Sequence, residues 1–171
     1  MRFIFPFLIL TIFSCQSSVN NKAVAVIQPG NGFNTRGVVE FFQKNDGVDI
    51  KVSLSGLNSN SYHGFHVHEF GDIRSSDGKS AGGHYNPDGN PHALPPEKNR
   101  HAGSFGNLVS NSNGVVDTLF FDNTISVSQK HNPIIGRSLV VHEKKDDGGQ
   151  PTGNAGARIG FGVIGIAKDS K

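Results

Sequence analysis

The sequence of 171 residues contains one cysteine, one methionine and no tryptophan. Because a disulfide needs two cysteines, no bridge can form within the chain, and the fold must be stable without one. An excess of charge of one sign is also lacking: 16 Lys and Arg oppose 14 Asp and Glu, for a net charge of +2. With no basic run behind that small surplus, we expect no nucleic-acid partner.

Long hydrophobic runs are absent except near the N-terminus, where Arg2 precedes the apolar stretch from Phe3 to Phe13. This stretch is too short to span a bilayer and is typical of the hydrophobic region of a secretory signal. We therefore predict a signal peptide over 1–14 and an exported protein; the alternative is a buried strand or helix of the domain.

Cys15, the single cysteine, follows Ile12-Phe13-Ser14 in a pattern similar to the lipobox of bacterial lipoproteins. We expect Cys15 to be acylated and to anchor the protein to a membrane, in the periplasm or at the surface of a bacterial cell. Cleavage by ordinary signal peptidase is the alternative. The polar residues 15–22 then form a tether, and 23–171 form the folded domain.

Glycine is abundant, with 22 residues, and many short β-branched runs are separated by turn signals such as Asn45-Asp46-Gly47 and Asn111-Ser112-Asn113-Gly114. This pattern predicts an all-β domain built as a closed or nearly closed antiparallel sandwich or barrel. The expected strands are Ala23–Gln28, Gly37–Gln43, Val48–Ser55, His63–Glu69, Leu108–Ser110, Val115–Phe121, Ser138–His142 and Ile159–Ala167.

One segment, 71–104, interrupts the regular spacing of the expected strands: it is rich in Gly, Pro, Asn and Asp and has no strand or helix periodicity. A loop of such length inside a compact domain is usually functional. It contains His84, His92 and His101, which supports that interpretation.

His66 and His68 alternate with Phe65 and Val67, so on a strand both imidazoles lie on one face. Two imidazoles on one face can reach one metal ion, although such a pair alone is weak evidence. With the three loop histidines and His142, which ends an apolar strand, the concentration favours a copper or zinc site. The other two, His63 and His131, we expect to be structural or exposed.

Four segments then carry a resemblance to a known family: Gly64-Phe65-His66-Val67-His68-Glu69-Phe70-Gly71-Asp72, Ser80-Ala81-Gly82-Gly83-His84-Tyr85-Asn86-Pro87, Gly136-Arg137-Ser138-Leu139-Val140-Val141-His142-Glu143 and Gly153-Asn154-Ala155-Gly156-Ala157-Arg158. In this order they resemble copper–zinc superoxide dismutase, as does the C-terminal Gly162-Val163-Ile164-Gly165-Ile166-Ala167. The resemblance covers the domain from Ala23 to Lys168. It implies an eight-stranded antiparallel Greek-key β-barrel or sandwich, immunoglobulin-like, with long metal-binding loops.

The resemblance implies a copper site of His66, His68, His84 and His142, and a zinc site of His84, His92 and His101. It also implies that superoxide becomes oxygen and hydrogen peroxide by cycling between Cu(II) and Cu(I), with His84 bridging the metals and releasing a proton. Arg158 matches the residue that docks the anion beside copper, and Thr152 the threonine that narrows the channel opposite it. Asp146 matches the carboxylate that links a copper histidine to a zinc histidine, here His66 and His92.

The sequence departs from the family in three places. Ser104 stands where the family has an aspartate zinc ligand, so we expect a weakened zinc site, completed by water or by Asp88. Gly78 and Phe161 stand where the family has its disulfide, so the loop must be held otherwise, in part by burial of Phe161. Only residues 148–151 separate Asp147 from Thr152, and this short segment predicts weaker guidance of superoxide.

Two other functions compete with a dismutase. A copper-binding or copper-delivery protein needs the same four histidines but no anion-docking residue, and Arg158 argues against it. An inert interaction domain predicts loss of the copper histidines, all of which are present. The resemblance also implies a homodimer, although the motifs themselves do not indicate the surface through which it would form.

Overall fold

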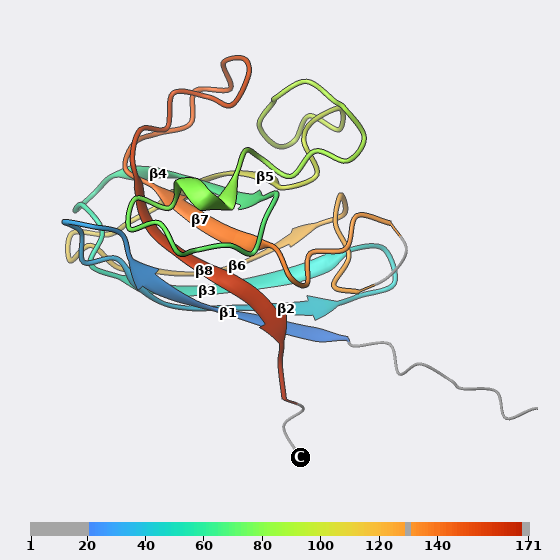
Figure 1. Ribbon diagram of the computed structural model, residues 1–171, viewed down its shortest axis with the longest axis horizontal. Coiled ribbons are helices and arrows are strands. Elements are labelled where there is room, and N and C mark those ends of the chain that lie inside the picture. Colours follow the sequence, from blue (N-terminus) through green and yellow to red (C-terminus); the bar gives the residue numbers. More distant parts are fainter. Residues whose placement is uncertain (1–20, 129–130, 169–171) are drawn as a thin grey trace, which may run out of the picture.

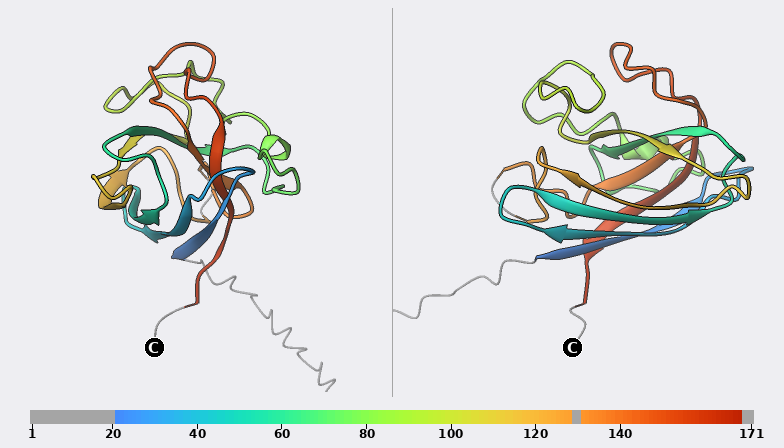
Figure 2. Two further views of the ribbon diagram at one scale, coloured as in Figure 1. Left: turned by 90° about the vertical axis from the view of Figure 1, so that its left-hand side faces the viewer. Right: turned by 180° about the vertical axis from the view of Figure 1, so that it is seen from behind.

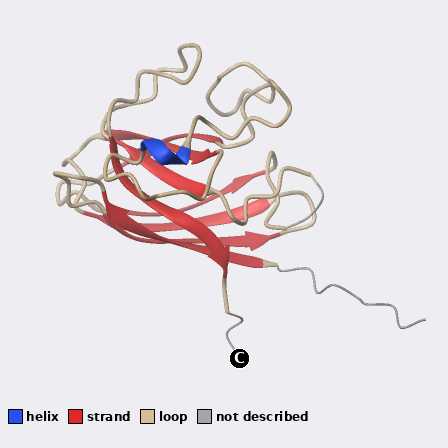
Figure 3. Ribbon diagram, viewed as in Figure 1, coloured by secondary structure: helices blue, strands red, loops and turns tan. Residues whose placement is uncertain are grey.

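The computed structural model describes residues 21–128 and 131–168, which form eight strands and one short 3-10 helix (Figures 1 and 3). The segment 1–14 and Cys15 lie outside the described residues. The elements are β1 Lys22–Pro29, β2 Arg36–Gln43, β3 Val48–Ser55, β4 Tyr62–His68, η1 Lys79–Ala81, β5 Ser104–Val109, β6 Val116–Asp122, β7 Ser138–His142 and β8 Arg158–Ile166. Within the described residues, no helix is long and apolar enough to cross a membrane. The prediction of an all-β domain is confirmed.

Strand β3 shows how the sequence selects this fold. Its apolar side chains Val48, Ile50, Val52 and Leu54 are buried, and the polar residues between them face outward. This period of two fits a strand with one face on the core, where burying each aliphatic side chain contributes roughly 1.5–3 kcal/mol. Gly47 ends the preceding turn because a Cβ there would lie 2.4 Å from the Asp122 carbonyl oxygen.

All the strands pair antiparallel, in the order β5-β4-β7-β8-β1-β2-β3-β6. The pairs β3–β6, β4–β7 and β1–β8 join strands that are distant in sequence, as a Greek-key topology requires. The sheet curls into a nearly closed barrel whose two end strands, β5 and β6, border a cavity of about 530 Å³. The core inside the barrel contains Phe41, Ile50, Phe65, Leu139 and Ile164, all fully buried.

Two long segments cover one side of the barrel, above β4, β5 and β7 (Figures 1 and 2). The first joins β4 to β5 and contains η1; the second joins β7 to β8. Because β4 and β7 are paired neighbours, both segments rise from the same part of the sheet. Residues far apart in the sequence therefore meet there.

Candidate metal centre

His66 and His68 lie on β4, and His142 is the last residue of the neighbouring β7. Phe65 and Val67 point into the core and are fully buried, so the two histidines between them face the opposite side. The β4–β7 register places His68 opposite Ser138, and an isolated bridge joins His68 to His84 of the long loop. Two strands and one loop thus bring four imidazoles together.

The histidines form two groups, in each of which one nitrogen per residue lies within 4.8 Å of the others. The four-histidine group contains His66, His68, His84 and His142. The three-histidine group contains His84, His92 and His101. His84 belongs to both, so its two ring nitrogens can serve two adjacent ions. All six side chains are buried.

Hydrogen bonds at the outer nitrogens orient the rings of the four-histidine group. His68 Nδ1 donates to the Gly82 carbonyl at 3.0 Å, and His142 Nδ1 donates to the Gly156 carbonyl at 3.3 Å. The inner Nε2 atoms of the same two rings lie 3.4 Å apart. This arrangement fixes the tautomers so that nitrogen lone pairs point into the group, which is what a metal ion requires.

The His66 ring gives the strongest indication of a ligand. Its Nε2 donates to Asp146 Oδ2 at 2.7 Å, while its buried Nδ1 has no hydrogen-bond partner within the described residues. A buried polar nitrogen without a partner is costly in a structural role. His63 Nε2 is also buried without a partner within the described residues, but His63 belongs to neither histidine group, whereas His66 lies among three other imidazoles. The donor set of four imidazole nitrogens fits copper, and the unpartnered Nδ1 fits a metal–nitrogen bond.

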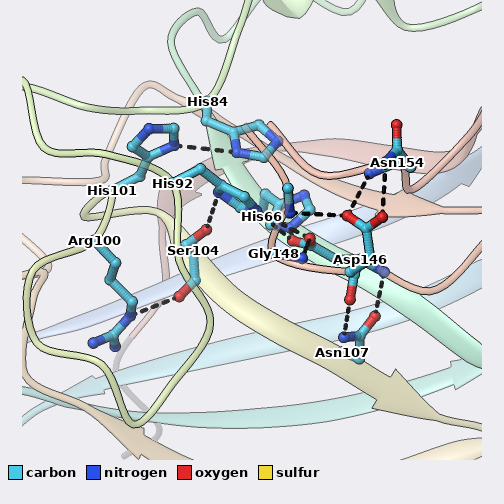
Figure 4. Close-up of polar contacts among 12 residues, drawn as sticks. His66, His84, His92, Arg100, His101, Ser104, Asn107, Asp146, Gly148 and Asn154 are labelled. Carbon is cyan, nitrogen blue, oxygen red and sulfur yellow. Dashed lines mark hydrogen bonds and ion pairs between the residues drawn. The ribbon is translucent and has the colours of Figure 1, made fainter. Parts of the chain in front are cut away.

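Asp146 connects the two groups and is fully buried (Figure 4). Besides His66, it accepts from His92 Nε2, with both carboxylate oxygens at 3.0 Å, and from the Gly148 amide at 2.9 Å. Burial alone would raise the pKa of Asp146, but the bonds from the two histidines outweigh it and lower the pKa. The carboxylate therefore stays ionised and holds both rings in place.

Burial also keeps the imidazoles neutral. It lowers the pKa of His142 to about 3, and it also lowers the pKa of His68 and of His84, with neighbouring charges adding to the effect. Neutral imidazoles retain the lone pair that binds a metal. These rings are therefore ready to act as ligands at physiological pH.

Among the described residues, no carboxylate joins the three-histidine group. His101 Nδ1 and His84 Nδ1 lie 3.4 Å apart, and the Ser104 hydroxyl lies 3.2 Å from His92 Nδ1 (Figure 4). Ser104 is fully buried and lies next to His92, a member of this group. The other expected substitute, Asp88, is exposed, accepts a hydrogen bond from Asn132 and lies outside the group.

Arg158, the first residue of β8, is paired with His142 at the rim of the four-histidine group. Its guanidinium donates from Nη1 to the Gly78 carbonyl at 2.6 Å and from Nη2 to the Gly82 carbonyl at 2.7 Å. Those carbonyls flank η1, so the short helix fixes the position of the cation. Arg158 and His68 both donate to the Gly82 carbonyl, so the two side chains lie close together, and the charge of Arg158 helps to lower the pKa of His68.

Thr152, the residue expected opposite Arg158, lies half-buried in the turn after Pro151. Within the part of the chain that the structure describes, no hydrogen bond of its side chain defines a role, so the narrowing of the channel by Thr152 stays a prediction.

His63, expected from the sequence to be structural or exposed, is fully buried and donates from Nδ1 to the His142 carbonyl at 2.8 Å. Two supporting side chains were not identified from the sequence. Asn107 exchanges two hydrogen bonds with the backbone of Asp146, and Gln150 exchanges two with the backbone of His92. No signal in the sequence marked these two amides.

Comparison with known proteins identifies the family. The family model for copper/zinc superoxide dismutase matches residues 35–164. A Cu-Zn superoxide dismutase of Paramecium bursaria Chlorella virus 1 is 43% identical over 176 residues, covering 98% of this chain and 92% of that protein. The extracellular Cu-Zn superoxide dismutase of Drosophila melanogaster is 44% identical over 157 residues, covering 85% of each chain.

Among solved structures, that of the clock protein EA4 matches with a TM-score of 0.81 and 38% identity, over 90% of this chain and 99% of that one. Its fold therefore agrees with the barrel described above. The chain belongs to the copper/zinc superoxide dismutase family.

Proposed function

We propose that the chain is a superoxide dismutase in which the four-histidine group holds copper and the three-histidine group holds zinc. Two superoxide anions and two protons then give one oxygen and one hydrogen peroxide. The observation that carries this proposal is the place of His84 in both groups, with the guanidinium of Arg158 at the rim. The family membership of the chain supports the same reaction.

Copper, when bound, supplies the one-electron exchange between two oxidation states that the reaction needs. The side chains of this chain supply anion binding and proton transfer. Arg158, held by two carbonyls, binds the anion and keeps it beside the four-histidine group. His84 can hold a proton at Nε2 and pass it to the peroxide product, because its Nδ1 faces His101 instead.

Zinc binding by the three-histidine group should be weaker than in relatives with an aspartate ligand. Structural zinc sites normally close with four ligands, and a neutral serine hydroxyl is a poor one. Three imidazoles and the hydroxyl of Ser104 are the donors available here.

The test is superoxide decay with protein reconstituted with copper alone and with copper plus zinc. The proposal predicts decay far faster than the uncatalysed reaction in both preparations, with one copper per chain. A copper-holding protein would bind the same ion but leave the decay unchanged, and that result would contradict the proposal.

We also propose a homodimer formed through an exposed apolar face on β1, β8 and the β4–β5 segment. Val26 and Phe70 are more than half exposed, and Val163 is 38% exposed. They adjoin one another, since a Cβ on Gly71 would touch Val163 and a Cβ on Gly162 would touch the backbone of Val26. Sedimentation should give a dimer that Phe70→Glu dissociates; a monomeric wild-type protein would contradict this.

Export and lipidation of Cys15 complete the proposal. The apolar stretch from Phe3 to Phe13 and an extracellular relative support export. The mass of the mature N-terminus, measured for the wild-type chain and for Cys15→Ser, tests the anchor. A mature protein that begins after Cys15, or that carries an unmodified Cys15, would contradict lipidation.

A further inference from the structure

The barrel is open between β5 and β6, where the cavity of about 530 Å³ lies, and we call this space the seam cavity. Within the described residues, β5 pairs with β4 alone and β6 with β3 alone. A cavity of this volume with mostly apolar walls is typical of a site for a small molecule. The apolar walls are formed by Phe105, Leu108, Val109, Val116, Phe120 and Phe121.

The floor of the seam cavity is aromatic. The ring centroids of Phe105 and Phe120 lie 5.8 Å apart in a T-shaped contact. Both rings also contact Phe65 in the core, with centroid distances of 5.6 and 6.5 Å. Phe121 and Val109, by contrast, are more than half exposed. Rings that are held by the core on one side and border a cavity on the other can accept a further ring, so we expect an aromatic ligand.

Three charged side chains line the seam cavity. Arg100 Nη2 donates to Asp122 Oδ2, and because both side chains are buried together, their charges compensate each other. The third, Asp117, is exposed and accepts only a long hydrogen bond of 3.5 Å from the Ser53 hydroxyl, with no ion pair in the part of the chain that the structure describes. The walls therefore carry one uncompensated negative charge, which favours a cation.

The seam cavity is closed at both of its ends. At one end the segment 110–115 joins β5 directly to β6, and the Asn111 amide donates to the Val115 carbonyl at 2.9 Å. At the other end lies Arg100, which donates from Nε to the carbonyl of Ser104, the first residue of β5, at 3.0 Å. An added peptide strand of about five residues would have to pass through these closed ends, whereas a compact molecule of one or two rings fits between them.

Two polar side chains of the seam cavity also hold the metal centre in place (Figure 4). Asn107 Oδ1 accepts from the Asp146 amide at 2.7 Å, and Asn107 Nδ2 donates to the Asp146 carbonyl at 2.9 Å. Arg100 precedes His101 in the sequence and holds the carbonyls of Glu97 and Ser104. A molecule in the seam cavity would thus contact the residues that position the carboxylate and the loop of the two histidine groups.

We propose that the seam cavity binds a small aromatic cation and that this binding is coupled to metal binding through Asn107 and Arg100. Only the coupling rests on the proposed function, since it needs metal ions in the histidine groups. Metal ions order the rings that hold Asp146, and the ligand orders Asn107 on its other side. Whichever binds second has less side-chain freedom to lose, so each should tighten the other. By linkage, the two affinities change by the same factor.

The probe for the site is 2-naphthylmethylammonium, and 2-naphthoate is its anionic counterpart. Each is titrated by calorimetry into the metal-free protein. One cation should bind per chain, about three- to tenfold more tightly than the anion at low ionic strength, and Asp117→Asn should remove this difference. Equal affinities of the two probes for wild type would overturn the cationic class of ligand. Failure of both probes to bind would overturn the site.

Thr118 and Leu119 provide a matched pair of variants on β6. Both side chains are exposed, but only Thr118 lines the seam cavity. Phenylalanine suits a strand at either position, so both variants should fold. Thr118→Phe should fill part of the cavity and weaken binding of 2-naphthylmethylammonium about tenfold or more, whereas Leu119→Phe should leave it unchanged. Equal effects of the two substitutions would overturn the location of the site.

The coupling is measured with the same probe on protein loaded with copper and zinc, with the metal content determined on each sample. Loaded wild type should bind the probe about fivefold more tightly than metal-free wild type, or tighter still. Asn107→Ala should bring this ratio close to one and leave the affinity of the metal-free protein unchanged, which a general loss of structure would not do.

Equal affinities of loaded and metal-free wild type for the probe would overturn the coupling. A chain that takes up no metal would overturn the coupling together with the proposed function. The titrations of the metal-free protein test the site by itself in either case.

Discussion

The ring of Phe161 lies directly against Gly78: a Cβ built on Gly78 would be 2.9 Å from two of the ring carbons. These are the two positions at which the family resemblance places a disulfide. Phe161 is 4% exposed and packs with Ala81 and Val140, so an apolar contact joins the β4–β5 segment to β8. The adjacent Gly78 carbonyl accepts from Arg158, and the same contact therefore supports the docking cation.

Phe161→Ala should lower the free energy of unfolding by about 3–5 kcal/mol, because it leaves a cavity beneath the segment. Denaturant unfolding of the metal-free protein, followed by circular dichroism, measures the change. Phe121, which is 51% exposed, provides the control: Phe121→Ala should cost far less. An equal loss in the free energy of unfolding for the two variants would show that the contact of Phe161 with Gly78 does not stabilise the fold. Reducing agents should not shift either midpoint, since no disulfide exists within the chain.

Asp146→Asn should weaken metal binding because an amide has one acceptor oxygen and cannot orient both His66 and His92. Removing such a partner typically reduces metal affinity about 10–100-fold. Competition with a chelator measures copper and zinc affinity separately. Asp147, which accepts from Gly149 and Asn154 on the surface, is the neighbouring control, and Asp147→Asn should leave both affinities unchanged. Wild-type affinities in Asp146→Asn would refute the linking role.

Ser104→Asp should tighten zinc binding because it adds an anionic oxygen beside His92. A residue that only hydrogen-bonds a metal ligand typically changes metal affinity about 10–100-fold, and a direct carboxylate ligand should change it by more than that. Isothermal titration with zinc of the protein already loaded with copper measures the effect. Ser104→Ala tests whether the hydroxyl contributes at all and should bind zinc no more tightly than wild type. If wild type already binds one zinc per chain as tightly as Ser104→Asp, the weakened site is ruled out.

Arg158→Ile should reduce the rate of superoxide decay at least tenfold while copper stays bound, because it removes the fixed cation and none of the four histidines. Copper content and decay rate are measured on the same sample. Arg137 donates to the Glu69 carbonyl and lies outside both histidine groups. The control variant is therefore Arg137→Ile, which should keep the rate of superoxide decay near that of wild type. Full activity in Arg158→Ile would contradict the docking role.

The strands were predictable wherever alternation and turn signals agreed. Val48–Ser55 and Ser138–His142 have the bounds expected from the sequence, since their apolar residues are bounded by glycine-containing turns. The strand expected at Leu108–Ser110 begins earlier, at Ser104, because Gly106 has φ of 79° and interrupts the alternation that would have revealed it. Lys22, expected in the tether, is already part of β1, which extends the pairing to Phe42 by one residue.

The two histidine groups follow from the family resemblance, whose motifs are long and specific, whereas the concentration of histidines alone predicts only a copper or zinc site. Their supports were not predictable, since Asn107 and Gln150 act through backbone contacts made by residues that are distant in sequence. Metal-ligand motifs can be recognised in the sequence, whereas contacts between common polar residues that are distant in the sequence become visible only in the folded structure.

The central claim is that His66, His68, His84 and His142 bind one copper ion. Crystals of the copper-loaded protein, measured on both sides of the copper absorption edge, locate that ion by its anomalous scattering. A single strong peak among those four imidazoles, with bond lengths near 2 Å to His66 Nδ1, is the predicted result. A copper peak elsewhere in the molecule, with none between these rings, would contradict it.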